Sequence, residues 1–187
     1  ALGSGAGDGR LVNRAFVIDD SGAIRARYEK MQLFDVDLAT GESWRESSAY
    51  APGGGAVAVD TPWGRLGLSI CYDLRFPDLY RALTDAGATM LAIPAAFTVP
   101  TGQAHWHVMM RARAIENASY VVASAQTGQH EDGRATYGHS LVADPWGHVV
   151  AKASDGVGIV SARVDRKRVD KARQMIPVAQ HRVKLTE

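Results

Sequence analysis

The chain has 187 residues, of which 46% are hydrophobic and 22% are charged, a composition typical of one globular domain with a sizeable core. Its 21 basic and 20 acidic residues leave a net charge of +1, which gives no electrostatic reason to expect nucleic acid or an anionic membrane as a partner. No apolar run approaches the roughly 20 residues that span a bilayer, and one cysteine permits no internal disulfide. We therefore expect a single cytoplasmic domain over residues 1–187.

The first half of the chain predicts two hairpins joined by a long loop. Alternating apolar residues between turn-forming residues indicate four strands, at residues 13–19, 23–28, 56–60 and 65–70. Residues 35–55 have little periodicity and carry Pro52 and four glycines, so they predict an irregular loop of the kind that shapes a site. The glycine-rich opening, residues 1–9, lacks the strand and helix that flank a phosphate-binding loop, and we interpret it as a loop or a frayed end.

The second half of the chain predicts strands that alternate with helices. Pro77 and Gly87 mark the start and the stop of a helix over residues 77–86. Helical spacing indicates a second helix at 104–117, and a basic helix follows at 165–174. The expected strands are residues 90–94, 120–125, 140–144, 149–153 and 158–164. This order, with hairpins mixed in, favours the α/β class with a mixed sheet.

The single cysteine, Cys71, stands where the second hairpin ends and the chain turns toward the helix that begins at Pro77. Backbone N–H groups and the positive end of a helix lower the pKa of a thiol and stabilise an oxyanion, which is what a catalytic nucleophile needs. The alternative is that Cys71 packs as a small buried hydrophobe, the usual role of a lone cysteine.

Three sequence segments carry a family resemblance, and they span residues 28–35, 70–77 and 111–117. Their order and spacing resemble the nitrilase superfamily of carbon–nitrogen hydrolases. The likeness continues through residues 137–140, 144–147 and 180–182, so it covers nearly the whole chain. Residues 97–106 resemble the Nit branch of this superfamily, and its deaminated glutathione amidases more than its ω-amidases.

The resemblance implies a four-layer α-β-β-α sandwich with mixed sheets that pairs with a second copy as a homodimer. It also implies a Glu–Lys–Cys triad, with Cys71 as the nucleophile and Lys30, aided by the Tyr72 backbone N–H, at the oxyanion. Glu46 matches a second glutamate that orients the lysine. On spacing alone, Lys30 and Glu46 would be interpreted as solvated charges. The family's general-base glutamate lies, with the first strands, in a segment that this sequence does not contain, so we expect the chain alone to be inactive or nearly so.

The implied reaction is hydrolysis of a primary amide of a small carboxylate-bearing substrate, similar to deaminated glutathione, to acid and ammonia through a thioester on Cys71. We expect Phe97, Thr101 and Arg75 to select the acyl group, because arginine binds a carboxylate bidentately. A structural ion pair of Arg75 with a neighbouring aspartate is the alternative. Two other functions stay open: an ω-amidase of 2-oxo-dicarboxylic acid monoamides, and a non-catalytic member of the family.

No cofactor and no metal are expected, so the predicted partners are a small-molecule amide and a second copy of the chain. His105 and His107 point to different faces of the predicted helix, and no cysteine or acidic partner follows them at ligand spacing. Arg111 and Arg113 lie beside Glu116, and we interpret the three as an ion-pair network that braces the site.

Overall fold

The computed structural model describes residues 2–4, 8–38, 41 and 43–183. Its strands are β1 (Leu2–Ser4), β2 (Leu11–Ile18), β3 (Ile24–Glu29), β4 (Asp35–Asp37), β5 (Ser43–Arg45), β6 (Val57–Thr61), β7 (Gly64–Leu68), β8 (Met90–Ala92), β9 (Tyr120–Ala123), β10 (Thr127–Gln129), β11 (Ala135–Tyr137), β12 (Leu141–Ala143) and β13 (Val149–Lys152). Its helices are α1 (Pro77–Asp85), α2 (Val99–Asn117), α3 (Arg166–Met175) and α4 (Val178–His181), with 3-10 turns η1 (Glu46–Ser48) and η2 (Cys71–Arg75). Residues 5–7 of the glycine-rich opening lie outside the described residues.

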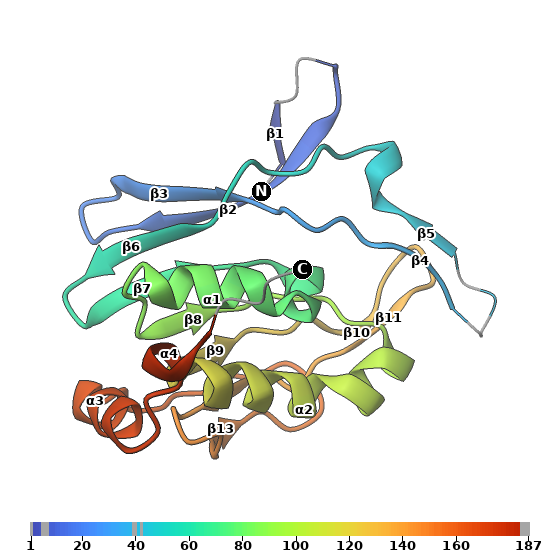
Figure 1. Ribbon diagram of the computed structural model, residues 1–187. Coiled ribbons are helices and arrows are strands. Elements are labelled where there is room, and N and C mark those ends of the chain that lie inside the picture. The colour runs from blue at the N-terminus through green and yellow to red at the C-terminus, as the bar shows by residue number, and fades with distance from the viewer. Residues whose placement is uncertain (1, 5–7, 39–40, 42, 184–187) are drawn as a thin grey trace.

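Six strands form the main sheet, in the order β13-β12-β9-β8-β7-β6. β8 is parallel to both β7 and β9, whereas the outer pairs are antiparallel, so the mixed sheet expected from the sequence is confirmed. The chain crosses from β7 to β8 through α1 and from β8 to β9 through α2, and both helices lie on the same side of the sheet (Figure 1). The carboxyl ends of these three parallel strands therefore meet at one edge, where α/β proteins build their sites.

A second layer is formed by the small sheet β1-β2-β3, which lies against the main sheet at β6 (Figure 1). Tyr28 of β3 is fully buried and belongs to the same hydrophobic core as Leu68 and Leu74. The described elements thus give consecutive layers of helix, sheet and sheet, which is the α/β class expected from the sequence. This packing also brings the end of β3 toward the end of β7.

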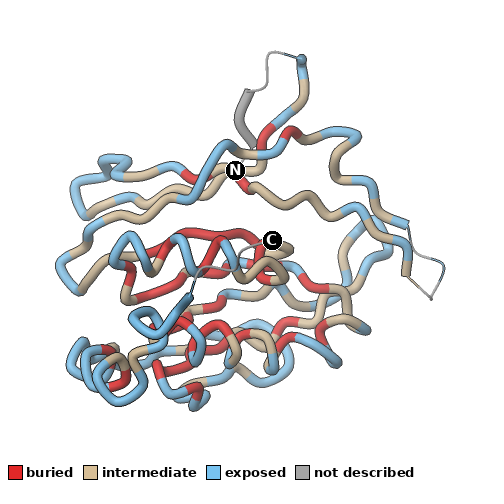
Figure 2. Tube along the Cα trace, viewed as in Figure 1, coloured by how far each residue is buried: buried red, intermediate tan, exposed pale blue. Residues whose placement is uncertain are grey.

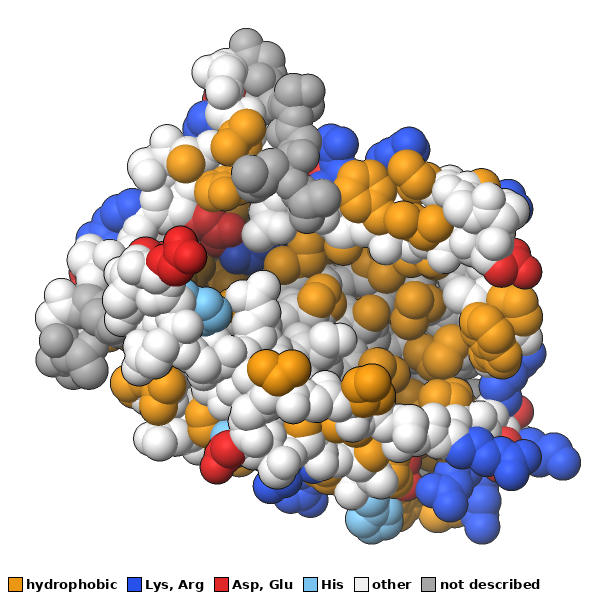
Figure 3. All heavy atoms as spheres, turned by 180° about the vertical axis from the view of Figure 1, so that it is seen from behind, with side chains coloured by type: hydrophobic (Ala, Val, Ile, Leu, Met, Phe, Trp, Pro, Cys, Tyr) orange, Lys and Arg blue, Asp and Glu red, His pale blue; other side chains and the backbone are white. Residues whose placement is uncertain are grey.

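The hydrophobic core lies between the main sheet and its covering helices. Buried residues concentrate in β8, in β9 and on the inner sides of α1 and α2 (Figure 2). Trp106 of α2 is fully buried, and its indole N–H donates to the His139 carbonyl at 2.8 Å. On the side turned away from the viewer in Figure 1, hydrophobic side chains gather in a broad hollowed area (Figure 3).

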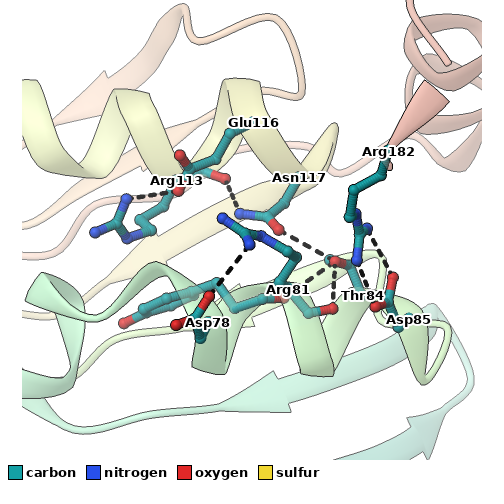
Figure 4. Close-up of polar contacts among 9 residues, drawn as sticks. Asp78, Arg81, Thr84, Asp85, Arg113, Glu116, Asn117 and Arg182 are labelled. Carbon is teal, nitrogen blue, oxygen red and sulfur yellow. Dashed lines mark hydrogen bonds and ion pairs between the residues drawn. The ribbon is translucent and has the colours of Figure 1, made fainter. Parts of the chain in front are cut away.

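Polar contacts fix α1 against α2 (Figure 4). Arg113 is buried, donates through Nε to the Leu74 carbonyl at 2.9 Å and pairs through Nη1 with Glu116 at 2.5 Å. The Asn117 amide joins the two helices, because its oxygen accepts from the Thr84 hydroxyl of α1, while its NH2 group donates to the Arg113 carbonyl within α2. The expected Arg113–Glu116 pair is therefore confirmed. Arg111 differs from the expectation, since its Nε donates to the Gly147 carbonyl.

Several boundaries differ from those that the sequence predicts. α2 begins at Val99, five residues before the expected start, because Thr98 is extended and Pro100 occupies the first turn, where its missing N–H costs nothing. The long loop at 35–55 is not irregular throughout, since it contains the β4–β5 hairpin and η1; residues 39, 40 and 42 of it lie outside the described residues. The short turn η2 was not expected at all.

The strand predicted at residues 158–164 is wrong. These residues pair with no other strand in the described part of the chain, and Ile159 is 98% exposed. The apolar alternation is genuine, but a strand also needs a hydrogen-bonding neighbour, which the sequence of the segment alone cannot supply. The segment instead runs as exposed chain from β13 to α3.

Candidate functional site

Cys71 lies three residues beyond the end of β7, as the first residue of η2. Its backbone N–H donates to the Pro94 carbonyl at 2.9 Å, and its φ angle is 50°, a left-handed conformation that is costly for a residue with a Cβ. A cavity of about 1050 Å³ opens beside it, at the shared edge of β7, β8 and β9. The fold thus holds the thiol in a strained turn on a cavity wall.

The Lys30 ammonium and the Glu46 carboxylate line the same cavity and pair with each other. Lys30 follows β3 and is 4% exposed, and its Nζ lies 2.5 Å from Glu46 Oε2. That carboxylate oxygen also accepts the Phe34 backbone N–H at 2.7 Å. Glu46 is the only acidic side chain among the described residues that line the cavity. The Glu46 carboxylate is therefore engaged by Lys30, the residue that the sequence leads us to expect it to orient.

Burial raises the pKa of the Cys71 thiol above its ordinary value. A hydrogen bond from the Ala96 backbone N–H and the charge of Lys30 act in the opposite direction, whereas the Glu46 carboxylate adds to the increase. The lowered pKa expected from the position of Cys71 is therefore wrong, because the loss of hydration outweighs the nearby positive charge. The resting group is a neutral thiol, and nucleophilic attack requires that a base remove its proton.

Asp73 ties the two halves of the site together, and sequence reasoning missed this role. Its side chain is fully buried and accepts hydrogen bonds from the Tyr28 hydroxyl, at 2.7 Å, and from the Ile70 and Gln32 backbone N–H groups, at 2.8 and 2.9 Å. These partners flank Lys30 on one side and Cys71 on the other. Burial raises the pKa of Asp73, while its hydrogen bonds lower it. The available signal was an acidic residue inside an apolar strand-to-turn segment.

The Tyr72 backbone N–H, predicted to stabilise the oxyanion, lies in the first turn of η2 and has no acceptor among the described residues. Unpaired N–H groups are normal at a helix start and are suited to bind developing negative charge. The Tyr72 ring packs edge-on against Phe34 and Phe76, with centroids 5.0 and 5.4 Å apart. Tyr72 lines the cavity, and its role at the oxyanion stays a prediction.

The three residues predicted to select the acyl group, Arg75, Phe97 and Thr101, all line the cavity. The Arg75 guanidinium lies 5.6 Å from the Phe97 ring centroid and 3.2 Å from His105 Nδ1. It forms no ion pair with a carboxylate in the described part of the chain. The alternative role for Arg75, as a structural partner of Asp73 or Asp78, therefore does not occur. Thr101 uses its hydroxyl to contact Thr98 at 2.8 Å.

Two further residues of the cavity wall were not anticipated, Trp44 of β5 and Arg134 of the turn between β10 and β11. The Arg134 guanidinium lies 5.0 Å from the centroid of the Trp44 indole, within the range of a cation–π contact. Both residues stand in short hairpins inside segments without strong periodicity, so their meeting could not be inferred from spacing.

No metal-binding group of three His, Cys, Asp or Glu side chains occurs in residues 8–38, 41 and 43–183. His105 lies beside Arg75, whereas the His107 ring packs against Tyr137 and His139. Of the helices in the described ranges, none combines the length and apolar character that crossing a bilayer requires.

Sequence comparison finds extensive similarity to known proteins. A family model described as carbon-nitrogen hydrolase matches residues 3–174. The deaminated glutathione amidase of Bos taurus is 47% identical over 174 residues, which cover 92% of this chain and 53% of that protein. The protein of the same name from Synechocystis sp. (strain PCC 6803 / GT-S) is 46% identical over 177 residues, covering 94% and 65%. The chain thus spans about half to two thirds of the length of these relatives.

Solved structures are also similar to this chain. The C. elegans NitFhit protein superposes with a TM-score of 0.87 at 49% identity, over 92% of this chain and 42% of that chain. Nit3 of Saccharomyces cerevisiae, a member of branch 10 of the nitrilase superfamily, gives a TM-score of 0.83 at 32% identity, over 94% and 62%. The similarity therefore extends over almost all of this chain and over part of each neighbour.

Proposed function

Because the chain belongs to the carbon–nitrogen hydrolase family, we propose that it hydrolyses a linear amide through a thioester on Cys71. The observation that carries this proposal is the placement of Cys71 beside the buried Lys30–Glu46 pair on the wall of one cavity. A non-catalytic role has less support, since an unused cavity gives no reason to bury a lysine at 4% exposure or to hold Cys71 in a left-handed conformation.

The reaction follows from the chemistry of these groups. The Cys71 sulfur attacks the amide carbon, and the electron pair of the carbonyl moves to its oxygen, where Lys30 and the Tyr72 N–H stabilise the charge. The thiol proton passes to the departing nitrogen, the C–N bond breaks and a thioester remains. Water then cleaves the thioester to the carboxylic acid. Because Glu46 is held by Lys30, the proton carrier is a separate carboxylate, the general-base glutamate that the family resemblance implies.

The substrate that we propose carries a 2-oxo-dicarboxylate acyl group, as deaminated glutathione does. Arg75 is suited to its carboxylate, because the guanidinium faces the cavity without an anionic partner among the described residues. Both amides of deaminated glutathione are secondary, so its cleavage releases an amine, and the primary amide and ammonia expected from the sequence do not apply to this substrate. A primary ω-amide of the same acyl group, the runner-up substrate, releases ammonia.

Turnover of two substrates tests the proposal. Deaminated glutathione and the monoamide of 2-oxoglutarate are incubated with the chain, to which a segment carrying the general-base glutamate implied by the resemblance is added in trans. The products 2-oxoglutarate, free amine and ammonia are measured separately, and the chain without that segment, expected to be inactive or nearly so, is the control. We expect product from at least one substrate, an acyl adduct on Cys71 in the mass spectrum of quenched samples, and neither with Cys71→Ser. Turnover that survives Cys71→Ser would contradict the proposed mechanism. A Cys71 that never becomes acylated would favour the non-catalytic alternative.

The family resemblance further supports a homodimer and a cytoplasmic location as parts of this proposal. Light scattering of the purified protein tests the first, with a mass near twice the 20.1 kDa of the chain expected. A mass equal to that of one chain at micromolar concentration would contradict it.

A further inference from the structure

The cavity is larger than a five-carbon acyl group requires. Its volume of about 1050 Å³ lies at the upper end of the range for ligand pockets, which is roughly 300–1000 Å³. It reaches from Cys71 to the turn between β10 and β11, where Arg134 lies. A substrate whose acyl half is bound near Arg75 therefore leaves the far part of the cavity to the departing half of the amide.

An aromatic wall connects the reacting cysteine to that far part. The ring of Tyr72, the residue after Cys71, contacts Phe34 with centroids 5.0 Å apart, and Phe34 contacts Trp44 at 5.9 Å. The Arg134 guanidinium ends the series, 5.0 Å from the Trp44 centroid. An amine that leaves from Cys71 along this wall meets apolar surface first and a cation at the end.

Arg134 is held in place but keeps donors for a ligand. Asp132 accepts the Arg134 backbone N–H through Oδ1 and binds Nε and Nη2 through Oδ2. Nη1, which carries two of the five guanidinium N–H bonds, has no partner among the described residues. Trp44 and Asp132 therefore restrict the position of the Arg134 guanidinium, while its Nη1 stays available to a ligand.

The other cations on the cavity wall are engaged. Lys30 pairs with Glu46, and Arg14 pairs with Glu29. Arg45 binds both oxygens of Asp37 through Nη2, and its Nη1 donates to the Trp44 carbonyl at 2.7 Å. With Arg75 assigned to the acyl carboxylate, Arg134 is the remaining arginine of the described cavity wall with an open end.

We propose that Arg134, seated on Trp44, binds a carboxylate of the leaving amine, so that the site selects amides whose departing half is an amino acid or a short peptide over primary amides. This inference rests on the proposed function and names its leaving group. Because the Arg134 side chain is 51% exposed, we expect a moderate preference, of up to about fivefold, which is what an ion pair at a partly exposed site supplies.

Binding to the Cys71→Ser variant tests the inference without turnover. Calorimetry compares deaminated glutathione with its C-terminal carboxamide, which lacks only the distal negative charge. We expect the carboxylate form to bind about two- to fivefold more tightly, and Arg134→Gln, made in the same background, to remove that difference. Asp132→Asn, which removes the competing anion, should preserve or increase it. Arg25→Gln is the matched control, because it makes the same charge change at the exposed start of β3, where Arg25 pairs with Asp19.

Turnover separates failure of the inference from failure of the proposed function. In the protein with Cys71 intact, Arg134→Gln should lower kcat/KM for deaminated glutathione and leave the primary monoamide of 2-oxoglutarate unaffected. If neither substrate is cleaved when the segment with the general-base glutamate is supplied in trans, the proposed function fails, while the binding comparison still decides the inference. Equal binding of the two ligands by Cys71→Ser, a preference that persists in Arg134→Gln, or equal loss of turnover on both substrates would each overturn it.

Discussion

At the scale of single residues, opposing contributions set the pKa of the nucleophile. Burial raises the pKa of Cys71, the Ala96 backbone N–H and Lys30 lower it, and the carboxylates of Glu46 and Asp73 raise it. Because burial raises the pKa of Cys71 above the ordinary value for a thiol, the folded protein favours the neutral thiol over the thiolate at rest. In the Glu–Lys–Cys triad that the family resemblance implies, the base therefore removes the thiol proton during the reaction, instead of a thiolate being maintained in the resting protein.

The pH profile of Cys71 alkylation checks this balance. We expect the rate with iodoacetamide to reach half its maximum at a higher pH than that of a free cysteine, because burial in the folded protein raises the thiol pKa. Glu46→Gln should move the midpoint to lower pH, since it removes a negative charge and frees the ammonium, and Lys30→Met should move it to higher pH. The rate is followed by intact mass, with circular dichroism as the control for folding. A wild-type midpoint below that of a free cysteine would contradict the raised pKa.

Asp73 supplies a second prediction at this scale. In Asp73→Asn the amide keeps one acceptor and loses the other, so either the Gln32 N–H or the Ile70 N–H is left facing a donor. We expect a loss of about 1–3 kcal/mol in the free energy of unfolding, the cost of a buried unsatisfied donor. Activity should also fall, because Lys30 and Cys71 lose the group that links their segments. Urea unfolding measures the first effect.

Asp78→Asn is the matched control for Asp73. The Asp78 side chain is 88% exposed and, among the described residues, pairs with Arg81 alone, so its loss should change stability by less than about 0.5 kcal/mol. Equal losses in the free energy of unfolding for Asp73→Asn and Asp78→Asn would show that the hydrogen bonds of Asp73 do not stabilise the fold.

Some features of the site could be predicted from the sequence at the residue scale, and others could not. Cys71, Lys30 and Glu46 could be predicted because a family motif preserves their order along the chain, and the structure places them together. Asp73 lies inside the same motif, but only a three-dimensional view reveals that its hydrogen bonds cross to the end of β3. The direction of the thiol pKa could not be predicted either, because it depends on how completely the fold excludes water.

At the scale of elements, α2 illustrates how packing overrides propensity. Residues 99–103 include a proline and a glycine, which weaken any prediction of helix, yet they form its first turns. Gly102 is buried there and lies against β11: a Cβ built on it would meet the Tyr137 Cβ and Cγ at 2.3 Å. Tertiary contact with the hairpin, rather than intrinsic preference, therefore requires glycine at this position.

Gly102→Ala tests that contact. Alanine would favour an isolated helix by about 1 kcal/mol, but the clash involves atoms close to the Tyr137 backbone, which cannot rotate away. We therefore expect net destabilisation of about 1–3 kcal/mol, typical of overpacking, measured as a lower midpoint of thermal unfolding. Gly54→Ala, at an open position with no atom within 4 Å, should show no such loss. An unchanged or raised midpoint for Gly102→Ala would show that the hairpin shifts freely.

At the scale of the whole molecule, the α/β class and the mixed sheet could be predicted because strands 65–70, 90–94 and 120–125 each carry a local pattern and are joined by helices. Residues 158–164 carry the same kind of pattern and form no strand in the described part of the chain. Pairing is a property of two segments together. The difference between the two cases therefore lies in the surroundings: β7, β8 and β9 have neighbouring strands, whereas residues 158–164 have none within the ranges that the structure describes.

Limited proteolysis measures the consequence of that missing partner. Between the Ala153 N–H, which bonds to Ser140, and the Asp165 N–H, which bonds to Tyr120, no backbone hydrogen bond occurs in the described chain, and Val157 is 99% exposed. Such segments open at little cost in free energy. We expect trypsin to make its first internal cut in this segment, at Arg163, giving a fragment of residues 1–163 by mass spectrometry. Arg163→Gln should slow the appearance of that fragment without stabilising the fold. Early internal cleavage elsewhere, with residues 154–164 intact, would mean that this segment contacts a partner in solution. A second copy of the chain would then be the first candidate for that partner, and cross-linking would examine it.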